Sequence, residues 1–97
     1  MITIDAERYE VTVDGNEVHF SPIEFDIINA LKVKNGKVAT RKELALIVRP
    51  IPAKANAYEL RIIDQHIARI RGKLGAKFSG LIVTVPTRGY KLKTKVK

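Results

Sequence analysis

One segment of the chain carries three long polar side chains at intervals of four residues: Arg61, Gln65 and Arg69. An α-helix turns by about 100° per residue, so this spacing places all three on one side of a helix. Arginine can pair with guanine and glutamine with adenine in the major groove, because each side chain matches the hydrogen-bonding edge of that base. The pattern therefore predicts a surface that contacts double-stranded DNA. At least half of such contacts go to the DNA backbone, so base contact and phosphate contact both stay open for each residue.

The same segment carries the apolar residues that would hold such a helix in place. A stripe at helical spacing predicts a helix over about 57–74 with these side chains buried: Ile63, Ile67, Ile70 and Leu74. The opposite side presents Ala68 and Gly72 between the long polar side chains, with Arg71 and Lys73 flanking it. Small residues at this crest favour close approach to a major groove about 12 Å wide. We therefore expect these four residues to belong to the same DNA-facing surface.

The charge of the chain is unevenly distributed. Its 97 residues include 18 Lys/Arg and 10 Asp/Glu, which gives a net charge of +8. Residues 1–53 hold seven basic and eight acidic side chains, whereas residues 54–97 hold eleven and two. Concentrated positive charge indicates a polyanionic partner, and a basic solubilising surface is the simpler alternative. An acidic membrane is disfavoured, because the chain lacks tryptophan and its basic helix needs the apolar stripe for the core.

Several classes of protein are excluded by what the sequence lacks. The length suits one domain, and the absence of cysteine excludes a disulfide framework and thiolate metal sites. No apolar run approaches the ~20 residues of a membrane span, and residues 1–20 lack a secretory signal, so we expect a soluble, cytoplasmic domain. Ser21 and Ser79 suit a helix cap and a turn, without the spacing of a nucleophile and its base. We expect no catalysis, no metal and no cofactor.

The first third of the chain predicts a small antiparallel sheet followed by a helix. Apolar and polar residues alternate over about 2–20, including Tyr9, Val11 and Val13, and Asp14-Gly15-Asn16 favours a tight turn. His19 is expected to face solvent. The sequence Ser21-Pro22-Ile23-Glu24 has the form of a capping box, which predicts a helix over about 22–34. Its expected apolar stripe consists of four residues, Ile23, Ile27, Ala30 and Leu31, with Phe25 and Ile28 beside it.

A second, shorter helix is predicted over about 41–49. Thr40-Arg41-Lys42-Glu43 is another capping box, and the stripe below it is Leu44, Ile47 and Val48. The backbone N–H groups at such a start favour anions, so Thr40, Arg41 and Lys42 are candidate phosphate contacts. Prolines stiffen the loop that follows, 49–56, and Asn56 is a candidate cap for the third helix.

The end of the chain predicts a β-hairpin over about 81–94. Its strands flank the turn Pro86-Thr87-Arg88-Gly89. Thr84, Thr87, Arg88 and Tyr90 are candidate DNA contacts, and Arg88 at the tip could enter a narrow minor groove. Tyr90 is open to a packing role with its hydroxyl at the surface. Four lysines suit long-range attraction to phosphates: Lys91, Lys93, Lys95 and Lys97.

In order and spacing, these segments resemble the effector domain of the OmpR/PhoB family of bacterial response regulators, which belong to two-component systems. The most specific segments are residues 63–75 and Gly89-Tyr90-Lys91-Leu92. The resemblance implies an α+β winged helix-turn-helix: an N-terminal antiparallel sheet, a three-helix core and a C-terminal hairpin wing. It further implies that the third helix enters the major groove and the wing the neighbouring minor groove.

The same resemblance implies several partners and residue roles. His66 would donate to a phosphate, although a half-buried packing role stays open, and Asp64 would position neighbouring basic groups. The loop 49–56, through Arg49 and Lys54, would contact RNA polymerase. Two copies would bind as a tandem homodimer on direct repeats.

The sequence also departs from the family pattern. Ala68 and Gly72 replace arginine or other polar residues, Arg49 replaces a common tryptophan, and the wing arginine lies two positions nearer the tip, at Arg88. The family places a phospho-acceptor receiver domain ahead of this module, and here the chain begins at Met1. We therefore expect no phosphorylation switch in this chain, and a free-standing regulator of bacterial or phage origin.

The predicted function is sequence-specific binding of double-stranded DNA for transcription regulation. Two alternatives stay open. One is an interaction protein that binds RNA polymerase or a host regulator through the loop 49–56. The other is an architectural protein that bends DNA with little choice of sequence.

Overall fold

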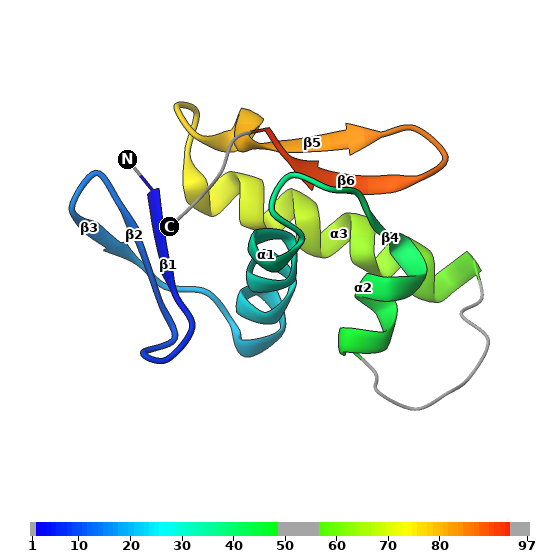
Figure 1. The fold of residues 1–97 in the computed structure, drawn as a ribbon, viewed down its shortest axis with the longest axis horizontal. Coiled ribbons are helices and arrows are strands. Elements are labelled where there is room, and N and C mark those ends of the chain that lie inside the picture. Colours follow the sequence, from blue (N-terminus) through cyan, green and yellow to red (C-terminus); the bar gives the residue numbers. More distant parts are fainter. Residues whose placement is uncertain (1, 49–56, 94–97) are drawn as a thin grey trace.

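The structure is a computed structural model that describes residues 2–48 and 57–93 (Figure 1). It has the predicted α+β class, with the elements in this order: β1 (Ile2–Asp5), β2 (Glu10–Val13), β3 (Asn16–Val18), α1 (Pro22–Lys34), β4 (Ala39–Thr40), α2 (Arg41–Val48), α3 (Ala57–Leu74), the 3-10 turn η1 (Ser79–Leu81), β5 (Ile82–Val85) and β6 (Gly89–Leu92). The predicted contacts Arg49 and Lys54, the cap Asn56, and Lys95 and Lys97 lie outside the described residues.

The N-terminal sheet has the strand order β1-β2-β3, with both pairs antiparallel. Asp14 and Gly15 have φ values of 48° and 83°, so the turn between β2 and β3 has the left-handed backbone that its sequence favours. The face that carries Ile2, Ile4 and Val11 is buried against the helices. The sheet lies at the opposite end of the molecule from the β5–β6 turn (Figure 1).

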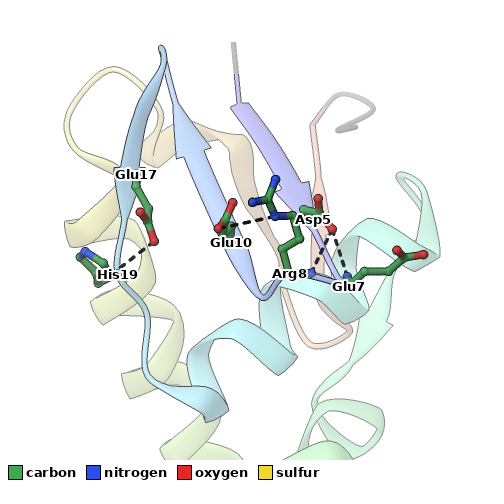
Figure 2. A network of polar contacts seen from close by, with 6 residues as sticks. All are labelled: Asp5, Glu7, Arg8, Glu10, Glu17 and His19. Atoms are coloured by element: carbon green, nitrogen blue, oxygen red, sulfur yellow. Dashed lines mark hydrogen bonds and ion pairs between the residues drawn. The ribbon is translucent and has the colours of Figure 1, made fainter.

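Tyr9 does not belong to a strand, and the prediction that it alternates with Val11 and Val13 is wrong. Figure 2 shows the reason: Asp5 Oδ1 accepts hydrogen bonds from the backbone N–H groups of Glu7 and Arg8, both at 3.1 Å. This closes a turn before β2, and Tyr9 leaves it with φ of 53°. The Tyr9 ring is mostly exposed and rests against Phe25, with the ring centroids 5.2 Å apart.

The outer surface of this sheet is polar. Arg8 pairs with Glu10 and His19 lies beside Glu17, each at 3.8 Å (Figure 2). His19 is exposed, as predicted. Ion pairs this exposed and this long contribute little to stability, so the sheet is held by its apolar face.

Helix α1 begins with the predicted capping box. The Ser21 hydroxyl accepts from Glu24 N–H, and the Glu24 carboxylate accepts from Ser21 N–H. The buried face of α1 consists of Glu24, Phe25, Ile27, Ile28 and Leu31. The prediction that Ile23 is buried is wrong, because it lies roughly 100° around the helix from the centre of that face.

Helix α2 packs through a narrower face than predicted. Leu44 is fully buried, and Ala45 and Val48 pack beside it. Ile47 is exposed, contrary to the prediction, because the buried face turns toward Ala45. Thr40 caps this helix as expected: its hydroxyl accepts from Glu43 N–H, and Glu43 accepts from Thr40 N–H.

The C-terminal wing is joined by a short strand from an earlier part of the chain, β4. β4 adds to the β5–β6 hairpin, which gives the antiparallel order β4-β6-β5. The short strand that precedes α2 thereby joins the wing to the helical core. Helix α3 runs alongside β5 and β6 (Figure 1).

One apolar core contains residues from every element except β3. The stripe of α3 lies at its centre, with Ile63, Ile67, Ile70 and Leu74 all buried as predicted. Among the described residues, no helix has the length and apolar character needed to cross a lipid bilayer.

Candidate nucleic-acid interface

Helix α3 has one buried side and one open side. Arg61, Gln65, Ala68, Arg69 and Gly72 are all exposed, as the helical spacing predicted. A Cβ atom added at Gly72 would meet nothing within 4 Å. Packing within the protein therefore does not require a small residue there, although glycine in a helix costs about 0.5–1 kcal/mol relative to alanine.

Asp64 lies on the side of α3 that faces the wing. Its Oδ1 atom accepts a hydrogen bond from Arg41 Nε at 3.0 Å, and a second from the Tyr90 hydroxyl. One carboxylate oxygen therefore joins the start of α2, the middle of α3 and strand β6. Asp64 positions a basic neighbour, as the family resemblance implied.

Arg71 lies on the same side of α3, about two helical turns further along the chain. Its Nη2 group donates to the Ile82 carbonyl at 2.8 Å and to the Thr84 hydroxyl at 2.9 Å, both on β5. Its guanidinium also lies over the Tyr90 ring, 5.7 Å from the centroid. Arg71 and Thr84, both predicted DNA contacts, are thus engaged with each other in this structure.

Tyr90 is buried in the wing sheet, and its hydroxyl is not at the surface, which corrects the predicted placement. The ring is covered because β6 is the central strand of this sheet and faces α3. Burial raises the pKa of the Tyr90 phenol, and the bonded Asp64 carboxylate adds to the effect, so the group stays protonated and donates. The predicted DNA contact of Tyr90 stays a prediction.

Lys73 flanks α3 on the opposite side, where it faces α1. Its ammonium group donates to the buried Glu24 carboxylate at 2.5 Å and lies 5.7 Å from the Phe20 ring centroid. Burial alone would raise the pKa of Glu24, but the hydrogen bonds from Lys73 and from Ser21 N–H outweigh it, so the net pKa is lowered. Lys73 therefore ties the third helix to the start of the first.

Glu24→Gln should destabilise the protein by about 1–2 kcal/mol at pH 7, because Lys73 loses a charge-assisted hydrogen bond while the helix cap is retained. The folded-state pKa of Glu24 lies below its unfolded value of 4.5, so its contribution is present above that pH and lost as the pH falls through the folded pKa. Urea unfolding between pH 3 and pH 7 measures this. We expect the free energy of unfolding to fall less between pH 7 and pH 3 in the variant than in the wild type. The same dependence on pH in both proteins would contradict the Glu24–Lys73 pair.

His66 is half-buried beside this pair, in line with the packing role left open by the sequence. Within the part of the chain that the structure describes, its Nδ1 atom is buried without a hydrogen-bond partner. Burial lowers the pKa of His66, and the positive charge of Arg69 lowers it further, against a smaller opposite effect of Glu24. The two larger effects therefore favour the neutral imidazole. Its predicted contact with phosphate stays a prediction.

The start of α2 presents Thr40 and Lys42 as exposed residues, with Arg41 half-buried on Asp64. Glu43 occupies part of this helix start through the capping box, and Lys34 pairs with it at 2.5 Å. The hydrogen bond from Lys34 is the main cause of the lowered pKa of Glu43. The predicted anion site thus already holds one carboxylate of the protein.

The tip of the wing exposes Thr87 and Arg88. Arg88 N–H donates to the Val85 carbonyl at 3.0 Å and closes the turn, while Thr87 adopts φ of 63°. Gly89, predicted as part of this turn, is instead the first residue of β6 and is buried against β4. Arg88 is thereby held at the outermost point of the hairpin.

Residues 15–92 match the protein family described as "Transcriptional regulatory protein, C terminal". The chain belongs to this family. It is 30% identical over 95 residues to the phosphate regulon transcriptional regulatory protein PhoB of Pseudomonas aeruginosa, which covers 97% of this chain and 40% of that protein. The chain thus spans about 40% of the length of this curated relative. The resemblance to OmpR/PhoB-type effector domains is confirmed.

Solved structures of similar domains confirm the winged-helix fold. The DNA-binding domain of Klebsiella pneumoniae RstA, in complex with the RstA box, has a TM-score of 0.78 and 29% identity, over 94% of this chain and 89% of that one. The DNA-binding domain of the response regulator AdeR, in complex with an intercistronic region, has a TM-score of 0.73 and 26% identity, over 96% and 94%.

The sequence analysis did not identify the particular partners of Asp64, which are Arg41 and Tyr90. It could have shown that Asp64 and Arg71 share one side of the helix, because they are seven residues apart and so lie within about 20° of each other. The buried partner of Lys73 was missed for a different reason. Glu24 had already been explained as a helix cap, and a cap gives no indication of burial.

Proposed function

We propose that this domain binds double-stranded DNA in a sequence-specific manner and regulates transcription, with α3 in the major groove and the β5–β6 wing in the adjacent minor groove. One observation carries the proposal. Arg61, Gln65 and Arg69 are exposed on one side of α3, and none of their side chains forms a hydrogen bond or ion pair with the side chains that the structure describes, those of residues 2–48 and 60–93. They are therefore available to an external partner.

The division of the basic residues supports this proposal. Arg41, Arg71 and Lys73 are engaged with acceptors inside the protein. Four other basic residues of α3 and the wing are exposed: Arg61, Arg69, Arg88 and Lys93. Positive groups that the fold does not use, placed on one helix side and one hairpin, match the two grooves that a winged helix can enter.

The similar domains support the same function. RstA and AdeR, at 29% and 26% identity over more than nine tenths of this chain, were both solved in complex with DNA. PhoB of P. aeruginosa is a transcriptional regulatory protein. By analogy, we propose that this domain acts on DNA in the cytoplasm of a bacterial cell.

The test is a binding titration against a sequence selected from a random duplex library and against unselected DNA, at several salt concentrations. We expect log affinity to fall steeply with log salt, and the selected site to bind at least ~10³-fold more tightly. An architectural bending protein would keep the salt dependence and lose the sequence preference. A protein that acts only through RNA polymerase would show neither.

Arg69→Ala and Lys93→Ala separate base reading from phosphate attraction. Arg69→Ala should cost about 1–3 kcal/mol on the selected site and relax the preference at one base position. Lys93→Ala should weaken selected and random DNA alike and reduce the salt slope by about 1. Fluorescence anisotropy on both DNAs measures this, and an equal loss on both DNAs for the two variants would show that Arg69 reads no base.

Two finer partner assignments remain part of this proposal. We propose tandem binding of two copies on direct repeats, for which the length of the footprint is the measurement: one domain would protect one repeat only. We also propose a contact with RNA polymerase near Arg49 and Lys54. The neighbouring α2 residues Leu46 and Ile47 are exposed apolar side chains and could extend that contact.

A further inference from the structure

Asp64 and Arg71 form two connections between α3 and the wing. The Asp64 carboxylate accepts a hydrogen bond from the Tyr90 hydroxyl of β6. The Arg71 guanidinium donates hydrogen bonds to the Ile82 carbonyl and the Thr84 hydroxyl of β5. The two residues lie within about 20° on the helix, so both face the hairpin and neither lies on the open side. The wing is therefore attached to α3 at two levels, through polar groups that the DNA-facing side does not use.

Tyr90 lies between the two connections. Its hydroxyl reaches Asp64, and its ring lies beneath the Arg71 guanidinium at 5.7 Å. β6 is the central strand of the wing sheet, so holding Tyr90 also holds β5 and the turn that carries Arg88. Arg41 shares the same Asp64 oxygen, which connects the start of α2 to this arrangement.

We propose that Asp64, Arg71 and Tyr90, here called the wing latch, are positioning residues that fix the wing relative to α3 and so determine whether helix and wing engage both grooves together. None of the three needs to touch DNA. The inference rests on the proposed function. It states that residues facing away from the DNA set the position of the wing relative to α3.

The physical reason is preorganisation. A hairpin that is free to move must be ordered when it enters a minor groove, and that entropy is subtracted from the binding free energy. The latch orders the wing before DNA arrives. Weakening it should therefore reduce the contribution of the wing while leaving the contribution of α3 intact.

Tyr90→Phe is the sharpest variant, because it removes only the hydroxyl that reaches Asp64 and keeps the buried ring. At protein concentrations that saturate the selected site, we expect protection of guanine N7 in the major groove to remain complete. The ratio of attached to free wing should fall by about fivefold, which corresponds to one hydrogen bond of about 1 kcal/mol, so minor-groove protection from hydroxyl radicals should weaken. Tyr9→Phe is the matched control, since Tyr9 is mostly exposed and lies in the turn between β1 and β2, away from the wing, and it should behave as the wild type.

A double-mutant cycle gives a second readout. Arg88→Ala should cost less in the Tyr90→Phe background than in the wild type, because a loosened wing has less contact to lose. If Tyr90→Phe does not fold, Asp64→Asn is the alternative first variant, with Asp26→Asn on the exposed side of α1 as its charge-matched control. Circular dichroism establishes which variants are folded.

The outcomes separate the latch from the proposed function. Protection of both grooves by the wild type, with an unchanged minor-groove signal and additive Arg88 costs in the variant, would overturn the latch alone. An equal loss in both grooves would also overturn it, because the residues would then support the whole domain and not the wing. A wild-type protein that protects no site would instead overturn the proposed function.

Discussion

Replacing Gly89 by alanine is expected to lower the free energy of unfolding by about 3 kcal/mol or more, one of the largest effects of a single methyl group in this chain. A Cβ at this position would lie 2.1 Å from the Ala39 carbonyl oxygen and 2.9 Å from the Thr40 Cα. Both atoms belong to the backbone of β4, which pairs with β6 here. Rotation of a side chain cannot relieve this clash, so the two strands must separate.

Urea unfolding followed by circular dichroism measures the effect, with Gly80→Ala as the matched control. A Cβ at Gly80 would meet nothing within 4 Å, so that variant should retain wild-type stability to within about 0.5 kcal/mol. The loss of β4 pairing should also weaken DNA binding, since β4 ends at the start of α2. A stable Gly89→Ala protein would show that β4 and β6 do not pair in solution.

Gly89 also illustrates what the sequence could not predict. Its place in a turn seemed sufficient to explain a glycine, and the true reason is a strand 49 residues earlier in the chain, at Thr40. Two residues of β4 carry too little alternation to predict a strand, and pairing between distant segments leaves no local pattern. The same limitation concealed the Tyr90 hydroxyl, whose partner Asp64 lies 26 residues away.

Local signals, in contrast, were sufficient for the helices. The capping boxes at Ser21 and Thr40 were both confirmed, because each depends on groups only three residues apart. The stripe of α3 was confirmed because four large apolar residues define one side without ambiguity. On α1, apolar residues occur around most of the helix, so periodicity could not decide whether Ile23 or Phe25 faced the core. In the structure Phe25 is buried and Ile23 is exposed.

For the candidate site, the sequence identified the basic side chains but not their partners. Arg69 and Arg71 are two residues apart and look equivalent by composition, yet one is exposed and the other is bonded to β5. The difference lies in what each side chain meets: Arg71 reaches the carbonyl oxygen of Ile82, whereas Arg69 faces solvent. The structure therefore reduces the predicted interface of α3 to the side that carries Arg61, Gln65 and Arg69.

Ala68→Leu should reduce specific DNA binding by about 100-fold while leaving stability almost unchanged. Ala68 is exposed at the centre of the open side of α3, so a larger side chain meets no part of the protein. In the proposed complex it would instead hold the helix away from the groove. Arg61, Gln65 and Arg69 would then lose contacts together, and a 100-fold change corresponds to one or two bidentate base contacts at about 1–3 kcal/mol each.

Titration of the selected duplex and thermal unfolding, run on the same protein preparation, provide the two measurements. Gly72→Ala serves as the graded comparison, because it adds one methyl group on the same side of α3. It should raise the free energy of unfolding by about 0.5–1 kcal/mol through helix propensity and weaken DNA binding less than Ala68→Leu does. A variant that is more stable and yet binds less tightly would show that the small residues of this helix serve the duplex and not the fold. Full binding by Ala68→Leu would instead mean that another surface of the domain meets the DNA.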